Sequence, residues 1–323
     1  MSQQIELQAE VGEQHTGMRL DQVLSELFSD YSRSRLKEWI LQGRVSIDGS
    51  VVDKPREKLQ GYETLTVQAV IEDVIEWQPE AVVLDVVYED DDILVINKAA
   101  GVVVHPGAGN HTGTILNGLL HNYPQSRQLA RAGIVHRLDK DTTGLMVVAK
   151  TVAAQTHLVE ALQARQITRE YEAIAIGQMT AGGLVDEPIG RHKTKRTQMA
   201  VDPAGRPSVT HYRVAEKFRQ HTRLRLRLET GRTHQIRVHM AYIGHPLVGD
   251  PAYAGRLRLP KGASPELIAV LRGFERQALH AAMLRLMHPI TGEEMEWHAP
   301  VPEDMLKVAE ALRQDSLEHD WQD

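Results

Sequence analysis

The chain has 323 residues, 42% of them hydrophobic and 25% charged, which is the composition of a globular protein with one large domain or a large and a small one. It contains no cysteine, so a disulfide scaffold, a zinc ribbon, an iron–sulfur centre and a thiol nucleophile are excluded together. The formal net charge of −6, taken alone, argues against nucleic-acid binding, because phosphates attract a basic surface. The polar start and the lack of any apolar run of about 18 residues predict a cytoplasmic protein that does not span a membrane.

The first part of the chain, residues 1–75, predicts a small compact module. Apolar residues recur at helical spacing over 20–28 and over 36–40, which indicates two amphipathic helices. An Asp-Gly pair between two short β-branched runs predicts a hairpin over 44–52. Basic residues gather on the second helix and in the turn after it, where a solvated helix face and a phosphate-contacting edge both explain them. These residues are Arg33, Arg35, Lys37 and Arg44.

Charge is strongly segregated along the chain. Residues 61–97 contain ten acidic residues and no lysine or arginine, and residues 303–323 contain seven acidic and two basic residues. Residues 191–237 contain thirteen basic and three acidic residues, a local net charge of +10 that concentrates a positive field on one segment. We therefore expect an acidic linker over 76–82 and a larger domain over 83–323, with a basic surface and an acidic C-terminal tail.

Apolar, β-branched runs and helical patterns alternate irregularly in the larger domain. The predicted strands are 81–87, 93–96, 133–135, 145–149, 171–176, 209–214 and 222–229. The predicted helices are 114–121, 153–164, 233–242, 265–271 and 302–313. Strands outnumber helices without regular alternation, which favours an α+β fold with a mainly antiparallel mixed β-sheet over a doubly wound parallel fold.

A dense polar loop, residues 136–143, lies between two of these apolar runs. Catalytic side chains are often found on loops that a rigid sheet presents, and Asp139 stands in this one between Arg137 and Lys140. An aspartate that hydrogen-bonds its own turn explains the same residue without catalysis. Asp139 is therefore a candidate catalytic carboxylate, and both interpretations stay open at this point.

An arginine-rich strand is predicted at 222–229, where Arg223, Arg225 and Arg227 alternate with three leucines. On a strand this alternation places the guanidinium groups on one face and the leucines on the other. Such stripes are often solvated strand faces. The polar turn and helix that follow, with Arg232 and Arg237, favour recognition of phosphate or carboxylate groups.

Two further signals are weaker. Tyr171 begins a predicted strand, where its ring is either part of the core or a stacking platform for a base. The sixteen histidines include no His-Glu-x-x-His pattern and no cluster with ligand spacing, so we predict no metal site.

Several segments resemble known families. His136-Arg-Leu-Asp-Lys-Asp-Thr-Thr-Gly144 resembles the signature of pseudouridine synthases of the RluA class, and Gly231-Arg-Thr-His-Gln-Ile-Arg-Val-His239 with Gly244-His-Pro-Leu-Val-Gly-Asp250 resembles their second conserved block. The N-terminal module, with Ser32-Arg-Ser-Arg-Leu-Lys37, resembles an S4 RNA-binding domain. The resemblance covers nearly the whole chain. It departs from the family at Asn97-Lys-Ala-Ala-Gly101, where a proline usually follows the lysine.

The resemblance implies roles for single residues. Asp139 matches the catalytic aspartate, which attacks the target uridine at C6 of the base or at C1′ of the ribose. Arg237 matches the basic residue that pairs with this aspartate. Tyr171 matches the tyrosine that stacks on the base and is placed to assist proton removal at C5. Arg137 matches an arginine that fills the space of the flipped base.

Three further residues are expected to contact the substrate. Leu247 is a candidate apolar wall for the uracil, and His136 and Arg232 lie in the matched motifs beside the catalytic residues. The arginine-rich strand and the basic residues of the N-terminal module are expected to bind RNA.

The resemblance implies an isomerase that converts specific uridines of 23S ribosomal RNA, in the loop of helix 69, to pseudouridine. No atoms are gained or lost in that reaction, so we expect no cofactor. Flipping the target base costs a few kcal/mol, which stacking on one aromatic ring largely offsets at about 1–3 kcal/mol. The implied partner is large-subunit ribosomal RNA or a pre-50S particle, and we expect a monomer.

Two other functions fit parts of the sequence. Asp139-Lys-Asp-Thr-Thr143 fits the Asp-x-Asp-x-Thr pattern of aspartate-based phosphatases, which also need a buried apolar strand directly before the first aspartate and acidic Mg²⁺ ligands downstream. A non-catalytic RNA-binding factor built on the N-terminal module is the other alternative. The presence of Asp139, Tyr171 and Arg237 together argues against it.

Overall fold

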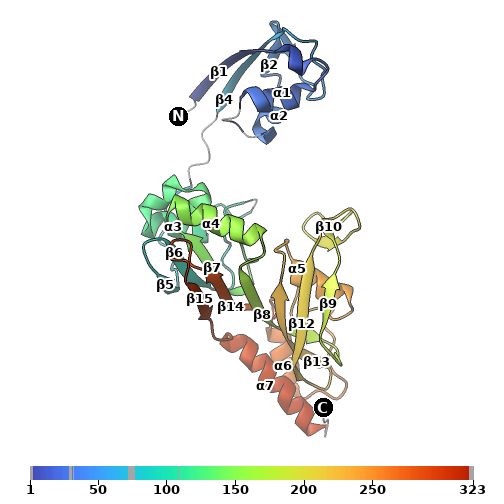
Figure 1. Cartoon of the computed structure of the whole chain (residues 1–323). Coiled ribbons are helices and arrows are strands. Elements are labelled where there is room, and N and C mark those ends of the chain that lie inside the picture. Colours follow the sequence, from blue (N-terminus) through green and yellow to red (C-terminus); the bar gives the residue numbers. More distant parts are fainter. Residues whose placement is uncertain (1–2, 29–30, 32, 72–76, 108, 320–323) are drawn as a thin grey trace. The chain divides into compact units, whose positions relative to one another are not determined.

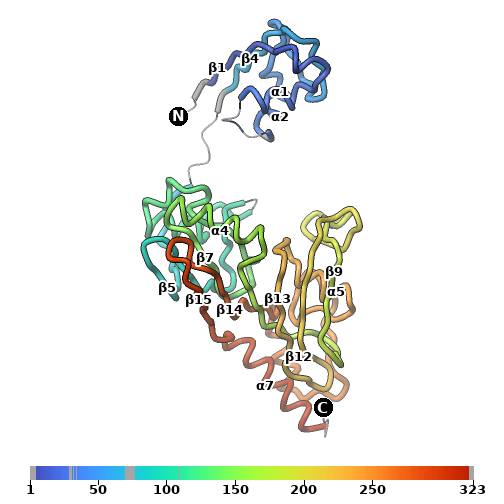
Figure 2. The backbone as a smooth tube through the Cα atoms, in the orientation of Figure 1, coloured from blue at the N-terminus to red at the C-terminus, as the bar shows by residue number. Residues whose placement is uncertain are grey.

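The computed structural model describes residues 3–28, 31, 33–71, 77–107 and 109–319. The chain divides into two compact units, Met1–Glu76 and Trp77–Asp323, and each has its own hydrophobic core. Figure 1 shows the elements of each unit, and Figure 2 traces the backbone through them. Among the described helices, none combines the length and the apolar character needed to cross a bilayer.

The first unit packs two helices against a four-stranded antiparallel sheet with the strand order β1-β4-β2-β3. Apolar side chains at three- and four-residue spacing fill its core, because that spacing places them on one face of each helix. The predicted helices and hairpin are confirmed. The elements are β1 (Gln3–Glu10), a 3-10 helix (Glu13–His15), α1 (Leu20–Leu27), α2 (Arg33–Leu41), β2 (Val45–Ile47), β3 (Ser50–Val52) and β4 (Thr64–Ile71).

The second unit is built on a nine-stranded sheet with the order β5-β6-β7-β14-β8-β13-β12-β9, in which β15 also pairs with β14. Among the described strands, the short pairing of β7 with β14 is parallel and the other pairings are antiparallel, which confirms the expected α+β class. The strands are β5 (Val86–Glu89), β6 (Ile93–Lys98), β7 (Thr143–Ala149), β8 (Thr168–Ile176), β9 (Gly183–Asp186), β12 (Val209–Lys217), β13 (His221–Leu228), β14 (Leu279–Met287) and β15 (Glu294–His298).

Helices cover this sheet in separate hydrophobic clusters. Side chains of α3 and α5 pack in one cluster with Tyr171, those of α4 in a second, and those of α6 and α7 in a third. A two-stranded ribbon of β10 (Ile189–Arg191) and β11 (Met199–Val201) stands apart from the sheet. The helices are α3 (Ile115–Asn122), α4 (Val152–Gln163), α5 (Gln235–Tyr242), α6 (Pro265–Gly273) and α7 (Glu303–Glu318), with 3-10 helices at Pro124–Gln128 and Ala130–Gly133.

The strand predicted at 81–87 is wrong for most of its length, because only β5 from Val86 onward pairs with β6. The preceding residues pack against α3 instead. The side chain of Asn117 donates a hydrogen bond of 2.7 Å to the carbonyl of Gln78. A Cβ on Gly118 would lie 3.0 Å from the Cβ of Val82, so a glycine in α3 gives this segment its space. Of the predicted linker 76–82, Glu76 lies outside the described residues and the rest belongs to this packed segment.

The strand predicted at 133–135 is also wrong, since the chain forms a tight 3-10 turn there. Arg131 and Ala132 are left-handed, with φ of 54° and 53°, and Gly133 follows with φ of 84°. A Cβ on Gly133 would lie 1.9 Å from the carbonyl oxygen of Ala149, so only glycine fits. Ile134 then makes a single bridge to Val148 of β7, and the polar loop follows this bridge.

Candidate active site

A cavity of about 510 Å³ lies in the second unit, where the loop 134–142 faces the start of β8 and the turn before α5. It gathers residues far apart in the sequence around one polar space. Among its lining residues are Arg137, Asp139, Tyr171, Arg232, His234 and Arg237. Most of the sequence-predicted site residues of the larger domain are therefore in one place.

The backbone on the C-terminal side of Asp139 is held by two buried cations. The ammonium of Lys98 donates a hydrogen bond of 2.8 Å to the carbonyl of Lys140, and Nη1 of Arg276 donates one of 3.2 Å to the carbonyl of Asp141. Burial lowers the pKa of Lys98 to about 8. Because these contacts fix the loop, the Asp139 carboxylate is presented from a rigid scaffold.

Asp139, Arg237 and Asp250 form a row of alternating charges. Oδ2 of Asp139 accepts a hydrogen bond of 3.0 Å from Nη1 of Arg237. The other side of this guanidinium donates two hydrogen bonds to Asp250, from Nε at 2.7 Å and from Nη2 at 2.9 Å. Burial by itself would lower the pKa of Arg237, but the hydrogen bonds and charges of Asp250 and Asp139 outweigh it and raise that pKa. Arg237 therefore stays charged between two carboxylates.

The turn before α5 places Arg237. His234 has a left-handed backbone, with φ of 57°, and directly precedes the helix. The Gln235 side chain closes the turn, because its Oε1 accepts from Thr230 Oγ1 and from the Arg232 backbone, at 2.8 and 3.0 Å. Arg237 consequently lies in the first turn of α5, which begins at Gln235 instead of at the predicted residue 233.

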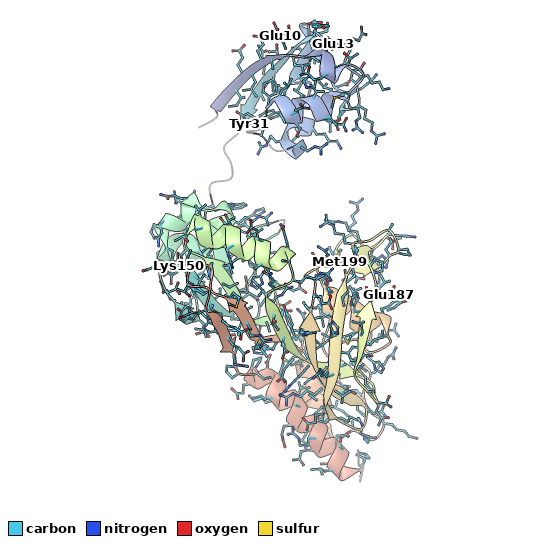
Figure 3. The ribbon with its side chains drawn as sticks, viewed as in Figure 1. Glu10, Glu13, Tyr31, Lys150, Glu187 and Met199 are labelled. Carbon is cyan, nitrogen blue, oxygen red and sulfur yellow. The ribbon has the colours of Figure 1, made fainter. Side chains whose placement is uncertain are left out.

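His234 lies beside Asp139, on the side of the carboxylate that Arg237 does not contact. Its Nε2 lies 3.9 Å from Oδ1 of Asp139, and its Nδ1 lies 2.7 Å from the hydroxyl of Tyr253. That hydroxyl also accepts a hydrogen bond of 2.9 Å from the backbone of Met199, which Figure 3 labels. Burial lowers the pKa of His234, and the Asp139 charge opposes this shift only in part. A neutral imidazole beside the aspartate follows.

Tyr171 lines the cavity with a side chain that is 6% exposed. Burial raises its pKa, which the positive charge of Arg169 opposes and the negative charge of Asp139 reinforces. Tyr171 belongs to the core cluster, as one of the two predicted alternatives has it, and it also borders the cavity, while stacking on a base stays a prediction.

His136 holds the loop to the sheet. Its Nε2 accepts a hydrogen bond of 3.1 Å from the backbone of Val147 in β7. Burial lowers the pKa of His136 to about 3, with a further contribution from the charge of Arg169, so the ring is neutral and can accept. His136 lines the cavity as well, so its observed contact is structural and its role toward the substrate stays a prediction.

The cavity is strongly basic. Its described lining contains six arginines and two carboxylates, Asp139 and Glu229. The sequence motifs did not indicate three of these arginines, nor His105, whose pKa is lowered to about 4 by burial and by the charges of nearby arginines. The sequence signal that could have found Arg169 is its position two residues before Tyr171, on the same strand face. The missed residues are His105, Arg131, Arg165, Arg169 and His234.

The structure corrects the expectation for Leu247. Its side chain is fully buried in the hydrophobic cluster that also contains Tyr171, and it is not among the described residues that line the cavity. The reason is a bridge between Leu247 and Ala175 of β8, which turns this leucine into the core. Apolar cavity walls come from other residues, which are Ile134, Val135, Leu138, Leu162, Leu228, Ile236 and Leu279.

The arginine-rich strand is β13, and its alternation is as predicted: the three leucines are buried and the three arginines are less so. Because the leucines pack in the cluster of Tyr171, the arginines project from the opposite face of β13. Arg223 is paired with Glu172, at 2.5 Å. Within the described chain, the side chains of Arg225 and Arg227 make no ion pair or hydrogen bond. They line a groove of about 730 Å³, together with Glu170, His211 and Arg213. These residues belong to β8, β12 and β13, which are labelled in Figure 1.

The basic residues of the first unit lie where the sequence placed them. Arg33 and Lys37 are exposed one turn apart on α2, and Arg44 is exposed in the turn before β2. Arg35 is half-buried on the same helix. The opposite side of α2 is buried in the core, so these cations share the outer side of the unit.

One group of described residues has the geometry to hold a metal ion: Asp90, Asp92 and His288. It lies outside the cavity, and Asp90 already accepts hydrogen bonds from Tyr88, from His288 and from two backbone N–H groups. The acidic Mg²⁺ ligands that a phosphatase needs are therefore not gathered around Asp139 among the described residues, which disfavours that alternative.

The sequence matches two protein-family models. The model described as RNA pseudouridylate synthase matches residues 92–242, and the model of the S4 domain matches residues 18–64. The first covers Asp139, Tyr171 and Arg237, and the second covers the basic residues of α2.

Curated relatives match over the full chain. Ribosomal large subunit pseudouridine synthase D of Yersinia pestis is 66% identical over 325 residues, which covers 99% of this chain and 100% of the relative. The protein of the same name from Vibrio parahaemolyticus is 67% identical over 319 residues, covering 99% and 98%. The solved structure of human RNA pseudouridylate synthase domain containing 4 has a TM-score of 0.55 and 26% identity, and the match covers 71% of this chain and 92% of that one.

Proposed function

Because the chain belongs to the RNA pseudouridylate synthase family and carries an S4 domain, we propose that it converts specific uridines of 23S ribosomal RNA to pseudouridine. The names of the relatives, which specify the ribosomal large subunit, support this class of RNA. Within it we propose the loop of helix 69 as the target, since unpaired bases of a hairpin loop cost less to flip than paired ones.

The observation that carries the proposal is the fixed Asp139 carboxylate, paired with Arg237 and facing a basic cavity beside Tyr171. Asp139 acts as the nucleophile, at C6 of the uracil or at C1′ of the ribose. The bond between N1 and C1′ breaks, the uracil rotates, and C5 bonds to C1′. The bond between Asp139 and the nucleotide also breaks before release, which regenerates the free carboxylate. C5 then loses its proton and N1 gains one, so no atom is gained or lost overall. A covalent intermediate divides one difficult rearrangement into easier steps.

Base flipping brings the uridine to this carboxylate. The flipped uracil lies against the ring of Tyr171, and Arg137, which is exposed at the cavity, occupies the space that the base leaves. Burial raises the pKa of Tyr171, so its hydroxyl stays protonated near neutral pH. A stacking role is therefore better supported than a role as the base that removes the C5 proton. Arg232 and His136 complete the substrate contacts at the cavity wall.

Two surfaces outside the cavity hold the rest of the RNA. The S4 domain uses Arg33, Lys37 and Arg44 for phosphate contacts, with Arg35 beside them. The groove on the far face of β13 uses its unpaired arginines, whereas the neutralised Arg223 contributes less. The RNA that these surfaces hold is large-subunit ribosomal RNA, free or in a pre-50S particle. The protein acts on it as a monomer in the cytoplasm.

The decisive experiment replaces Asp139 in the full-length protein and maps pseudouridine in 23S ribosomal RNA. Asp139→Asn keeps the shape of the side chain and removes the nucleophile, so turnover falls by more than about 1,000-fold while RNA binding is retained. Cells that lack the protein should lose pseudouridine in the helix 69 loop and regain it only with the unsubstituted chain.

Three outcomes would overturn the proposal. Substantial activity of Asp139→Asn would remove the nucleophile assignment. Unchanged pseudouridine in the helix 69 loop of the deletion strain would remove that target. Hydrolysis of a phosphate ester by the unsubstituted protein would favour the phosphatase alternative, if that hydrolysis required both Mg²⁺ and Asp139.

A further inference from the structure

Arg169 is a buried cation in the cavity with no counter-charge. Its side chain is 7% exposed, and within the described chain it makes no hydrogen bond or ion pair. Its Nε is enclosed by protein without any acceptor. Leaving a guanidinium buried and unpaired costs several kcal/mol, so an isolated arginine of this kind needs an explanation.

The surroundings of Arg169 make room for it but do not neutralise it. A Cβ on Gly231 would lie 2.8 Å from Nη1 of Arg169, so the missing side chain at Gly231 leaves space for the guanidinium. The two carboxylates of the cavity lining are engaged elsewhere. Asp139 accepts from Arg237, and Glu229 is bound by Arg165 and by a histidine on β12.

The position of Arg169 relative to Tyr171 indicates which group of a bound nucleotide would neutralise the guanidinium. The two residues stand at i and i+2 on β8, so both side chains leave the same face of the strand, about 6.8 Å apart along it. A nucleotide carries its phosphate at a comparable distance from its base. A base that reaches the ring of Tyr171 therefore brings a phosphate within reach of Arg169, whose planar fork binds phosphate through two hydrogen bonds.

We propose that Arg169 is a phosphate-binding residue for the RNA backbone at the target nucleotide. This inference rests on the proposed function, because it takes the cavity as the site of a flipped uridine. The energy lost by burying the charge in the free protein is recovered when the phosphate enters, so Arg169 favours the bound state specifically.

The test uses stability and activity of the same full-length variants. Arg169→Met removes the unpaired charge and keeps the apolar stem, so the free protein should melt about 2–4 °C higher than the parent. The same variant should show a KM for 23S ribosomal RNA raised about 10- to 100-fold, the equivalent of one lost charged hydrogen bond, with a smaller change in kcat. Arg169→Lys should keep part of the affinity.

Inorganic phosphate is the probe that does not depend on the RNA. At constant ionic strength, phosphate should raise the melting temperature of the parent and have no such effect on Arg169→Met. Arg285→Met is the matched control, because this arginine lies outside the cavity and pairs loosely with glutamates of β15, at 3.8 and 3.9 Å. It should leave the phosphate effect and the KM unchanged.

The outcomes separate this inference from the proposed function. A lower melting temperature for Arg169→Met with an unchanged KM would show that the arginine is structural and would overturn the inference. An equal phosphate effect on parent and Arg169→Met would also overturn it. If the parent did not isomerise ribosomal RNA, the proposed function would fail. The phosphate and melting measurements would still test whether Arg169 binds phosphate.

Discussion

Asp250 receives two hydrogen bonds from Arg237, at 2.7 and 2.9 Å, and its carboxylate is completely enclosed. Oδ1 of Asp250, which accepts from Nη2 of Arg237, also accepts hydrogen bonds from the backbone N–H groups of Ala252 and Tyr253. The orientation of the guanidinium is therefore fixed by Asp250, and Nη1 is left to reach Asp139 at 3.0 Å. Asp250 acts through Arg237 and is a positioning residue for the proposed nucleophile.

The first prediction concerns Asp250→Asn. The amide keeps the volume but places a donor against the guanidinium, so Arg237 should rotate away from Asp139. We expect kcat to fall about 10- to 100-fold, because one charge-assisted hydrogen bond is worth about 1.5–3 kcal/mol. KM for the RNA should change little, since Asp250 is enclosed and does not touch the substrate. Steady-state kinetics with a 23S fragment would measure both constants.

A purely structural role for Asp250 gives a different result. In that case Asp250→Asn would lower the melting temperature, while kcat per folded molecule would stay within about twofold of the parent. Arg237→Lys is the companion variant, since a lysine cannot donate to both carboxylates in this geometry. It should lower kcat to a similar extent.

The second prediction concerns the S4 domain. Replacing Arg33, Lys37 and Arg44 together by glutamine should weaken binding of the 23S fragment about 5- to 30-fold and leave kcat unchanged. The slope of log K against log salt should become smaller by about 2–3, because three phosphate contacts are removed. Filter binding over a range of salt concentrations measures both effects.

The same unit offers a charge-matched control. Lys54, Arg56 and Lys58 are exposed in the loop after β3, whose backbone hydrogen-bonds to the start of α1. Their replacement by glutamine removes three positive charges from the same domain. Equal losses of affinity in the two triple variants would show that only the overall charge of the domain matters.

Much of the fold could be predicted from local patterns, and one central strand could not. The helical spacing in the first unit and the leucine–arginine alternation of β13 are local signals, and the structure contains both elements. β14 was not predicted, since Leu279–Met287 is rich in alanine, leucine and methionine, which favour helices. It is a strand because β7, β8 and β15 pair with it on both sides.

The candidate site was predicted in part because its motifs are local while its contacts are not. The sequence indicated Asp139 and Arg237, which are 98 positions apart and form an ion pair. It did not indicate that Asp250 holds Arg237, or that Arg169 is unpaired in the cavity, because these facts depend on packing between distant strands and turns. Leu247 was assigned to the cavity from its motif, and the bridge to β8 places it in the core.

The third prediction concerns the groove on the far face of β13. Arg225→Gln combined with Arg227→Gln should raise KM for a long 23S fragment about 5- to 20-fold and make the salt slope smaller by about 2. A short stem-loop that fills only the catalytic cavity should be modified normally. Kinetics on the two RNAs, at equal salt, make the comparison.

A change of opposite sign tests the same surface. Glu170 lines this groove, and its side chain makes no ion pair or hydrogen bond in the described chain. Glu170→Gln removes a negative charge from the groove lining, at the position that pairs with Arg227 across β8 and β13, so affinity for the long fragment should increase. If the double arginine variant also lost activity on the stem-loop, or if Glu170→Gln had no effect, the groove would not be an RNA-binding surface.

The fourth prediction concerns stability in acid. His221 is 2% exposed, and burial lowers its pKa to about 4, which the charge of Asp315 opposes only partly. The unfolded chain binds this proton near pH 6.5, so between pH 6.5 and 4 the unfolded state carries more protons than the folded state. Stability is therefore complete above pH 6.5 and is lost as the pH falls towards 4, by up to about 3 kcal/mol for this residue.

His221→Phe should remove that contribution. The aromatic ring keeps most of the volume and does not titrate, so the free energy of unfolding should fall less steeply between pH 6.5 and 4 than in the parent. Urea denaturation of the full chain at several pH values measures the slope. His111, which is exposed, supplies the control, and its replacement by phenylalanine should leave the slope unchanged. If the free energy of unfolding of the parent and of His221→Phe changed in parallel with pH, the assignment would be contradicted. Such a result would mean that His221 does not take up a proton on unfolding between pH 6.5 and 4.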